Sequence, residues 1–408
     1  MGDILFLAHR IPFPPNRGDK IRAHHLLRKL ARIAPVHVGC FAESDADREA
    51  IGELADIAAS HRVVDRTKPL ALAGVEALLA AKPVSLTAFH SARLTQWVEQ
   101  TLACQPISAI VVFSGQMGQY VPDGFKGRVI IDLCDVDSAK FESYAKAGQR
   151  AWINAREARL LAREEERLAQ RADATILISD NEAALFESRL TNPLLADVRV
   201  LGNGIDAQFF DPDTVKPHAG IADRKGPHFV FTGQMDYPPN EAAALWVTDT
   251  LMPRVRSEYP EAEFHVVGRN PTRALQSRSD REGITVWGEV PDVRPFVAAA
   301  DVVLAPLMIA RGVQNKVLEA MAMAKPVLLT PEAATGIEAT DGLHWMQCVA
   351  DADLMAERLK THFANDPDGM AMGAHARAFV LGSHDWDAML APLETLVAEA
   401  GEGARNAA

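Results

Sequence analysis

The chain of 408 residues is too long for one ordinary hydrophobic core and suits two domains of about 200 residues each. Hydrophobic residues make up 48% of it and charged residues 24%, which is globular composition, and no apolar run approaches the ~20 residues that span a bilayer. The net charge of −12 argues against nucleic acid as a partner, and four widely spaced cysteines without a C-x-x-C pair predict neither a zinc site nor a disulfide framework. We therefore expect a cytoplasmic protein whose residues 1–8 form a first strand and not a signal peptide.

In the first half, short apolar runs alternate with helical patterns. Continuous apolar strands joined by helices are typical of a parallel sheet covered on both faces, so we predict a Rossmann-like domain. The strands are expected at 4–8, 36–41, 110–113, 129–131 and 174–178, and the helices at about 19–33, 45–59, 91–104 and 141–171.

The turn after the first strand holds candidates for binding a substrate. His9 ends that strand, and Arg17, Gly18 and Asp19 precede the first helix. Glycine would let the backbone approach a substrate, and aspartate is a common helix N-cap. The alternatives are a purely structural turn and a structural histidine.

The segment from Asp19 to Arg32 reads as a basic amphipathic helix. Between Arg10 and Arg32 lie seven lysines and arginines, opposed only by Asp19. Such a helix could contact anionic lipid weakly and in a salt-sensitive way, presenting a lipid-linked acceptor. The alternative is an exposed basic helix without a partner.

Three aspartates end and follow the strand at 129–131. Asp132, Asp135 and Asp137 could orient an acceptor hydroxyl or take its proton. They could equally cap the helix that starts near Ser138. They lie in the wrong half for a metal-binding Asp-x-Asp motif, so we predict no metal.

The alternation begins again after a linker-like stretch at 206–226. We predict an N-terminal domain at 1–205 and a C-terminal domain at 206–385, with a helix at about 386–402 packing back on the first. The second set of strands is expected at 229–231, 264–267, 284–287, 302–304 and 326–329, with a helix from about 240.

Two common nucleotide-binding motifs are missing from these halves. Neither first strand leads into G-x-G-x-x-G, and the chain has no G-x-x-x-x-G-K-[ST]. Hydride transfer and P-loop phosphoryl transfer are therefore disfavoured.

The most informative stretch runs from Ala305 to Ala322. A glycine turn leads from a buried strand into a helix that starts near Gln314 or Asn315, and free amides there can hold an anion. Arg311 and Lys316 add positive charge for a diphosphate, and Glu319 can accept both hydroxyls of a ribose. An ordinary helix with a solvated lysine and glutamate is the alternative. The predicted donor-binding residues are Gly233, Arg311, Gly312, Val313, Gln314, Asn315, Lys316 and Glu319.

These motifs resemble those of a known family. Residues 315–327, Asn-Lys-Val-Leu-Glu-Ala-Met-Ala-Met-Ala-Lys-Pro-Val, resemble the nucleotide-sugar signature of family-four retaining glycosyltransferases, which have the GT-B fold. Leu201–Asp206 resembles their domain-junction segment, and Phe231–Asn240 resembles the first strand and turn of their donor domain. With residues 132–138, the pattern is similar to sugar transferases of PEP-CTERM and exopolysaccharide systems.

The resemblance implies an α/β protein with two facing Rossmann-like domains, parallel sheets and an interdomain cleft. A UDP- or GDP-linked sugar would bind the C-terminal domain, and a glycan or lipid-linked acceptor would bind the N-terminal domain through Arg17, Gly18, Asp19 and Asp135. Retention is implied, with no cofactor. The leaving diphosphate would be stabilised by Arg311 and Lys316, and Asp132 and His9 complete the predicted catalytic set. The protein would be cytoplasmic, peripheral on the inner membrane face.

The sequence departs from the family at two places. The first of the two glutamates that many relatives carry is Arg311 here, which cannot act as a carboxylate. The donor-domain turn has Gln234, Met235 and Asp236 where many relatives have arginine and lysine. A nucleotide-sugar 2-epimerase and a non-catalytic nucleotide-sugar-binding scaffold are the alternative functions.

Overall fold

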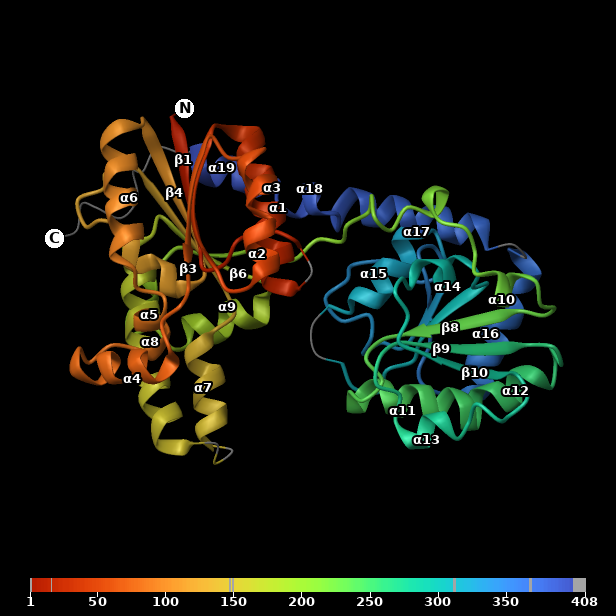
Figure 1. The fold of residues 1–408 in the computed structure, drawn as a ribbon. Helices are drawn as coiled ribbons and strands as arrows, with labels where there is room; N and C mark the ends of the chain where they lie inside the picture. Colours follow the sequence, from red (N-terminus) through yellow and green to blue (C-terminus); the bar gives the residue numbers. More distant parts are fainter. Residues whose placement is uncertain are drawn as a thin grey trace. The chain divides into compact units, whose positions relative to one another are not determined.

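A computed structural model describes residues 2–15, 17–146, 148, 150–310, 313–366 and 369–398. The chain divides into two compact units (Figure 1). One unit runs to Asn203 and takes in the segment from Met389, and the other is Gly204–Ala388. Each unit is built around one parallel sheet.

The N-terminal domain contains a seven-stranded sheet of order β3-β2-β1-β4-β5-β6-β7. All its strand pairs are parallel, and β1, β2 and β4 are almost completely buried because helices cover both faces. The strands are β1 (Asp3–Ala8), β2 (Val36–Ala42), β3 (Ser60–Asp65), β4 (Ile107–Phe113), β5 (Arg128–Cys134), β6 (Ala174–Leu177) and β7 (Val198–Val200).

Helices and short helical turns connect these strands. They are α1 (Gly18–Ile33), α2 (Asp45–Glu49), α3 (Ile51–Ala55), α4 (Leu70–Leu79), α5 (Val84–Ala88), α6 (Ala92–Cys104), η1 (Gly115–Tyr120), α7 (Asp137–Lys146), α8 (Ala151–Arg171), α9 (Asp180–Glu187) and η2 (Pro193–Leu195).

Two predicted helices are wrong as single elements. The helix expected at 45–59 is α2 and α3, and the one expected at 141–171 is α7 and α8. Between α7 and α8 the backbone of Gly148 (φ 76°) and Arg150 (φ 40°) is left-handed, which an α-helix cannot accommodate. The charge pairs that predicted one long helix are local and do not reveal this break.

The C-terminal domain contains a six-stranded parallel sheet of order β10-β9-β8-β11-β12-β13. Its strands are β8 (His228–Thr232), β9 (Glu263–Val267), β10 (Ile284–Gly288), β11 (Val302–Ala305), β12 (Val327–Leu329) and β13 (Met346–Gln347). The helical elements are η3 (Pro212–Thr214), α10 (Ala219–Ala222), α11 (Pro238–Trp246), the π-helical turn η4 (Val247–Leu251), α12 (Met252–Arg256), α13 (Arg273–Gln276), α14 (Arg294–Ala298), α15 (Asn315–Ala322), α16 (Ala352–Asn365) and α17 (Met370–Ser383).

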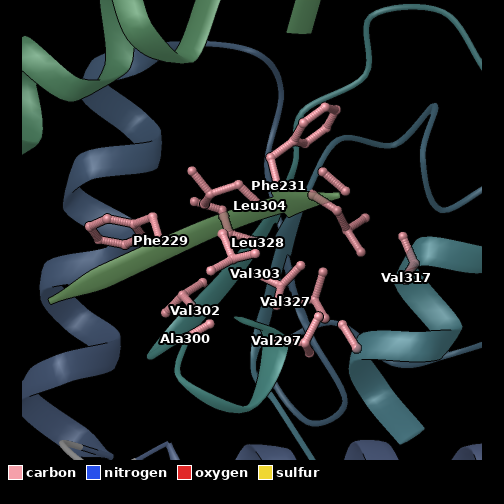
Figure 2. Close-up of a cluster of buried hydrophobic side chains, with 14 of the residues drawn as sticks. Phe229, Phe231, Val297, Ala300, Val302, Val303, Leu304, Val317, Val327 and Leu328 are labelled. Atoms are coloured by element: carbon pink, nitrogen blue, oxygen red, sulfur yellow. The ribbon is translucent and has the colours of Figure 1, made fainter. Parts of the chain in front are cut away.

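The core of this domain lies along the central strands β8, β11 and β12. Figure 2 shows Phe229 and Phe231 of β8 beside Leu304 of β11 and Leu328 of β12, and all four are at most 1% exposed. Val317 carries the apolar face of α15 into the same cluster. This packing holds the start of α15 at the carboxyl end of the sheet.

Two short helices end the described chain, α18 (Trp386–Met389) and α19 (Pro392–Ala398). Residues 386–388 of α18 belong to the second unit, whereas α19 lies against the N-terminal domain. Lys29 of α1 forms an ion pair with Glu394 (2.6 Å), and Arg128 donates to the carbonyl of Leu396 (3.1 Å). Among the described residues, no helix combines the length and apolarity needed to cross a bilayer.

Candidate functional site

A pocket of about 600 Å³ opens at the carboxyl ends of the strands in the C-terminal domain. This is where open parallel sheets bind ligands. Its apolar lining includes Phe210, Val290 and Val293, and the rest of the lining is largely backbone and charged groups. The polar lining comes from β8 and its turn (Thr232, Gly233, Gln234), from α11 (Asn240), from the end of β9 (Gly268, Arg269), from Glu289, and from α15 with its preceding loop (Val313, Asn315, Lys316, Glu319).

Helix α15 points its amino end at the pocket. It starts at Asn315, and its N-cap, Gln314, is extended and makes no side-chain cap hydrogen bond. Of the first-turn amides, that of Val317 donates to the Gln314 carbonyl (2.9 Å), and no side chain caps the helix. Such a helix end is suited to an anion, and the helix dipole adds partial positive charge. The predicted helix start and its relation to the preceding strand are confirmed.

Lys316 is held in place before any ligand binds. Its Nζ donates to Oδ1 of Asn240 (2.5 Å) and lies 4.4 Å from the centre of the Phe231 ring. The Asn240 Nδ2 donates in turn to the carbonyl of Gln234 (2.9 Å). Burial lowers the pKa of Lys316 from 10.5 to about 8, partly offset by Glu319. The ammonium therefore remains charged at neutral pH but is poorly solvated, which favours an anionic ligand.

Glu319 lies one turn further along the same helix. Burial raises its pKa to about 7, although Lys316 acts in the opposite direction. A partly buried carboxylate that lines the pocket can accept two hydroxyl hydrogen bonds without leaving its own helix. The pair thus offers one cationic and one accepting group from successive turns.

Gly233 and Gly268 bring two backbone turns close together at the pocket. A Cβ on Gly268 (φ 151°) would lie 1.7 Å from the carbonyl oxygen of Gly233, and one on Gly233 (φ 154°) would lie 2.9 Å from Nδ2 of Asn240 and 3.1 Å from Nζ of Lys316. Gly268 therefore cannot be replaced without moving the backbone, and a side chain at Gly233 would displace the ends of Asn240 and Lys316. Space beside the lysine is therefore kept open by backbone shape.

Arg269 is a pocket residue that the sequence analysis missed. It follows Gly268 at the end of β9, lines the pocket, and donates from Nη2 to Oε1 of Gln234 (2.7 Å). Its guanidinium stands on the turn where many relatives carry their own cations. The sequence signal that could have found Arg269 is the Gly-Arg pair directly after the predicted strand at 264–267. Because β9 runs parallel to β8, the two strands end at the same edge of the sheet.

Two predicted donor residues, Arg311 and Gly312, lie outside the described residues. Their roles stay predictions. Of the other predicted donor residues, Gly233, Val313, Asn315, Lys316 and Glu319 line the pocket together, and Gln314 is the N-cap of α15.

In the N-terminal domain, His9 and Asp19 form a polar cluster at the carboxyl end of β1. His9 Nε2 lies 3.2 Å from Oδ2 of Asp19, which also accepts from Arg10 Nη1 (2.8 Å), and Arg17 Nε donates to Oδ1 (2.8 Å). Burial opposes ionisation of Asp19, but bonds from His9 and Arg17 hold its pKa well below the usual range. The structure therefore brings three of the predicted acceptor-side residues together.

One detail of the predicted turn is wrong. Helix α1 begins at Gly18 with Arg17 as its N-cap, so Asp19 lies in the first turn and is not the cap. A Cβ on Gly18 would meet nothing within 4 Å, so the space beside Gly18 is open, and its role toward a substrate stays a prediction.

Asp132, predicted as catalytic, is a buried ion-pair partner. It has no exposed surface, and Nε of Arg22, itself 2% exposed, donates to Oδ2 over 2.8 Å. Arg22 also donates to the carbonyl of Leu201 (2.7 Å) and to Oδ1 of Asn203 (2.9 Å). The pair holds the predicted junction segment against α1, and it leaves Asp132 no exposed oxygen for an acceptor.

Asp135 is the exposed aspartate of this group. Partial burial, followed by the carboxylates of Glu182 and Asp137, raises its pKa. Its position after β5 places it at the same sheet edge as His9, since β1, β4 and β5 are parallel neighbours. A carboxylate with a raised pKa is a suitable proton acceptor. At the start of α7, the Ser138 amide donates to Oε1 of Glu165 (2.9 Å).

Helix α1 does not present the amphipathic surface predicted for lipid contact. Leu26, Leu27 and Leu30 are 0% exposed and pack inside the domain. Of the cations, Lys20 pairs with Asp47 (2.5 Å), Arg22 with Asp132, and Lys29 with Glu394. The basic stretch therefore serves mainly internal ion pairs.

Among the described residues, one group could place three ligands around a metal ion: His228, Glu263 and His265. Trp287 Nε1 can only donate, and it lies 3.3 Å from Nδ1 of His265, so the His265 proton sits on Nε2. That nitrogen lies 3.3 Å from Nδ1 of His228, whose Nε2 reaches the carbonyl of Arg224 (3.2 Å). Burial lowers the pKa of His265 to about 3, so this imidazole is neutral at pH 7, and both of its ring nitrogens have hydrogen-bonding partners. It lies at the amino ends of β8 and β9, away from the pocket.

Comparison with known proteins agrees with this geometry. Residues 226–365, which contain most of the pocket, match the family model described as Glycosyl transferases group 1, so the predicted resemblance is confirmed over that segment. A search of curated protein sequences gave no significant match.

Solved structures are similar over the whole chain. Sucrose-phosphate synthase from Thermosynechococcus elongatus has a TM-score of 0.57 at 16% identity and covers 97% of this chain and 98% of that one. HepE from Anabaena in complex with UDP has a TM-score of 0.61 at 14% identity, covering 98% and 100%. The lipopolysaccharide glycosyltransferase WaaG has 0.56 at 17%, covering 97% and 100%. The predicted fold class, α/β with two parallel-sheet domains of the GT-B type, is confirmed.

Proposed function

We propose that the protein is a glycosyltransferase that takes its sugar from a nucleoside-diphosphate donor. The observation that carries this proposal is the pocket at the end of β8, where Lys316, Asn240 and Glu319 stand beside the amino end of α15. The family match over residues 226–365 supports the same activity. The donor is a UDP-sugar in this proposal, since HepE is described in complexes with UDP and with UDP-glucose.

The diphosphate would lie against the first amides of α15, between Lys316 and Arg269. Both cations can stabilise the negative charge that grows on the leaving group as the glycosidic bond breaks. Glu319 would accept the ribose hydroxyls, and the apolar lining at Val290 and Val293 would take the base.

The acceptor would be bound by the N-terminal domain, near His9 and Asp135. We propose a glycan or lipid-linked acceptor, retention of anomeric configuration, and a role in exopolysaccharide or cell-surface glycan synthesis. The transition state would be oxocarbenium-like, and the donor's own phosphate could take the acceptor proton, so no protein nucleophile is required. Asp135, exposed and with a raised pKa, is the side chain best suited to assist.

The first experiment is a thermal-shift panel of nucleosides, nucleoside diphosphates and nucleotide sugars. A ligand at 100 times its Kd should stabilise the protein by about 2.7 kcal/mol, and we expect UDP to do so while uridine does not. No shift with any nucleoside diphosphate would contradict the proposal.

The second experiment separates transfer from the alternatives. The protein is incubated with the stabilising nucleotide sugar, with and without glycan or polyprenyl-phosphate-sugar acceptors, and products are analysed by mass and by NMR. A glycosyltransferase should give a glycosylated product only in the mixtures that contain an acceptor. A 2-epimerase would change the sugar without one, and a binding scaffold would leave the donor intact in every mixture.

A further inference from the structure

Helix α4 (Leu70–Leu79) has its apolar face reversed. Ala73 and Ala77 are 0% exposed and pack against the domain, whereas Leu72, Leu78 and Leu79 face outward and are more than half exposed. A helix on a globular protein normally buries its large apolar residues and exposes polar ones. Here only the small alanine side chains of α4 pack against the domain.

The exposed row is continuous and almost free of charge. Leu72, Val75 and Leu79 follow at helical spacing on one face, and Val75 is 55% exposed. The one carboxylate of the helix, Glu76, is paired with Lys68 (2.7 Å). Contiguous apolar surface of this kind, in contrast to scattered single residues, marks an interaction site.

The start of α8 extends this surface. Arg156 Nη2 donates to the carbonyl of Ala77 (2.7 Å), so α8 lies against the end of α4, and Figure 1 shows the two helices side by side with α5. Trp152 and Ile153 lie one turn before Arg156 on the same side of α8, and they are 68% and 45% exposed. An exposed tryptophan thus lies one helical turn from the arginine that joins α8 to the end of α4.

The surroundings are strongly basic in an acidic protein. Residues 146–163 contain five lysines and arginines and a single carboxylate, Glu157, in a chain of net charge −12. Glu157 is 3% exposed and accepts from the amides of Val84 and Ser85 (2.9 and 3.1 Å), so it does not face outward. Exposed cations of these segments include Lys82, three residues after the end of α4, and Arg150 and Arg159, which flank Trp152 in the sequence.

The outward residues of α4, together with Trp152 and Ile153, are named the α4 surface. We propose that the α4 surface docks on an anionic lipid bilayer. Leucines on a protruding helix can enter the acyl boundary, tryptophan is favoured at the headgroup level, and cations attract anionic headgroups. A symmetric dimer through the same surface would bring two basic rims together, which like-charge repulsion disfavours.

The test is co-sedimentation of the full chain with vesicles of phosphatidylcholine and phosphatidylglycerol, against vesicles of phosphatidylcholine alone. We expect binding to the anionic vesicles at low salt, weakened by high salt. Leu72→Ser/Leu78→Ser/Leu79→Ser should lower the bound fraction by about tenfold or more, since the apolar contact is lost. Lys82→Gln/Arg159→Gln should weaken binding by about 25-fold, since each of the two cations near such a surface contributes roughly fivefold.

Two matched controls keep the result specific. Leu194→Ser removes a leucine that is 94% exposed on η2, outside the α4 surface, and should leave binding unchanged. Arg28→Gln/Arg32→Gln removes exposed cations of α1 and should also leave it unchanged, which separates the α4 surface from the basic helix.

Every substituted residue is exposed, so nucleotide binding should be retained as evidence of folding. The proposal is overturned if the wild-type chain ignores anionic vesicles at low salt, or if the triple serine variant binds as well as wild type. It is also overturned if the leucine row mediates concentration-dependent dimerisation instead, measured by sedimentation velocity without lipid.

Discussion

Replacing Lys316 with methionine should weaken nucleotide binding while making the unliganded protein more stable. Burial lowers the pKa of this lysine from 10.5 to about 8. One pKa unit corresponds to about 1.4 kcal/mol, so the shift corresponds to at most about 3 kcal/mol of destabilisation at pH 7. The side chain is partly exposed and solvent screening reduces this figure, so we expect Lys316→Met to raise the free energy of unfolding by about 1 kcal/mol.

The pH dependence gives the sign of this effect independently. The folded-state pKa lies below the unfolded value, so between pH 8 and 10.5 the unfolded chain binds more protons than the folded one. The destabilisation by Lys316 is fully present below pH 8 and disappears as the pH rises toward 10.5. The stability difference between wild type and Lys316→Met, measured by urea unfolding, should therefore shrink from pH 7 to pH 10.

Binding should respond in the opposite direction. A hydrogen bond to a charged group is worth about 1.5–3 kcal/mol, so the Kd for UDP should rise by roughly 10- to 150-fold in titration calorimetry. Lys325→Met is the matched control, because burial also lowers the pKa of Lys325 and it does not line the pocket. An unchanged Kd for UDP in Lys316→Met would refute the assignment of this lysine to the diphosphate.

Further predictions concern the same pocket. Burial raises the pKa of Glu319 to about 7, so nucleotide affinity of the wild type should fall by about tenfold per pH unit below 7. This loss of affinity at low pH should be absent in Glu319→Gln. If it persists in that variant, the titrating group is another residue. Arg269→Gln should raise the Kd for UDP by about tenfold and leave uridine binding unchanged, with exposed Arg273→Gln as the control; equal losses for both ligands would exclude a phosphate contact. Gly233→Ala should destabilise by about 1–3 kcal/mol and also weaken UDP binding, whereas Gly288→Ala, whose added Cβ meets nothing, should cost only backbone strain.

The pocket at the end of β8 was largely predictable because its signals are local. A buried strand, a turn and the segment from Asn315 to Glu319 follow one another in sequence, and each determines where the next lies. Helix spacing alone places Lys316 and Glu319 on successive turns. Arg269 escaped notice because it reaches the pocket from a different strand, and only the parallel register of β8 and β9 brings it there.

The N-terminal domain was harder to predict because its polar residues pair over long distances. Asp132 and Arg22 are separated by 110 positions, and nothing in either local pattern names the other. An aspartate at a strand end suggests an acceptor site, and an arginine in a basic helix suggests a surface charge. Each interpretation is reasonable alone, yet the two residues form one buried pair.

The buried ion pairs of α1 also explain why the membrane contact that the sequence predicted for α1 is now proposed for α4. Lys20 and Arg22 are at most 5% exposed, and breaking a buried ion pair by removing one partner costs about 3–5 kcal/mol, so these charges are committed to the fold. The leucines of α1 are buried because α1 packs on the sheet through them. The leucines of α4 stay exposed because α4 packs against the domain through its alanines alone. A helix whose leucines face the core has no apolar surface to give a bilayer. The lipid hypothesis therefore belongs to the helix that leaves its leucines exposed.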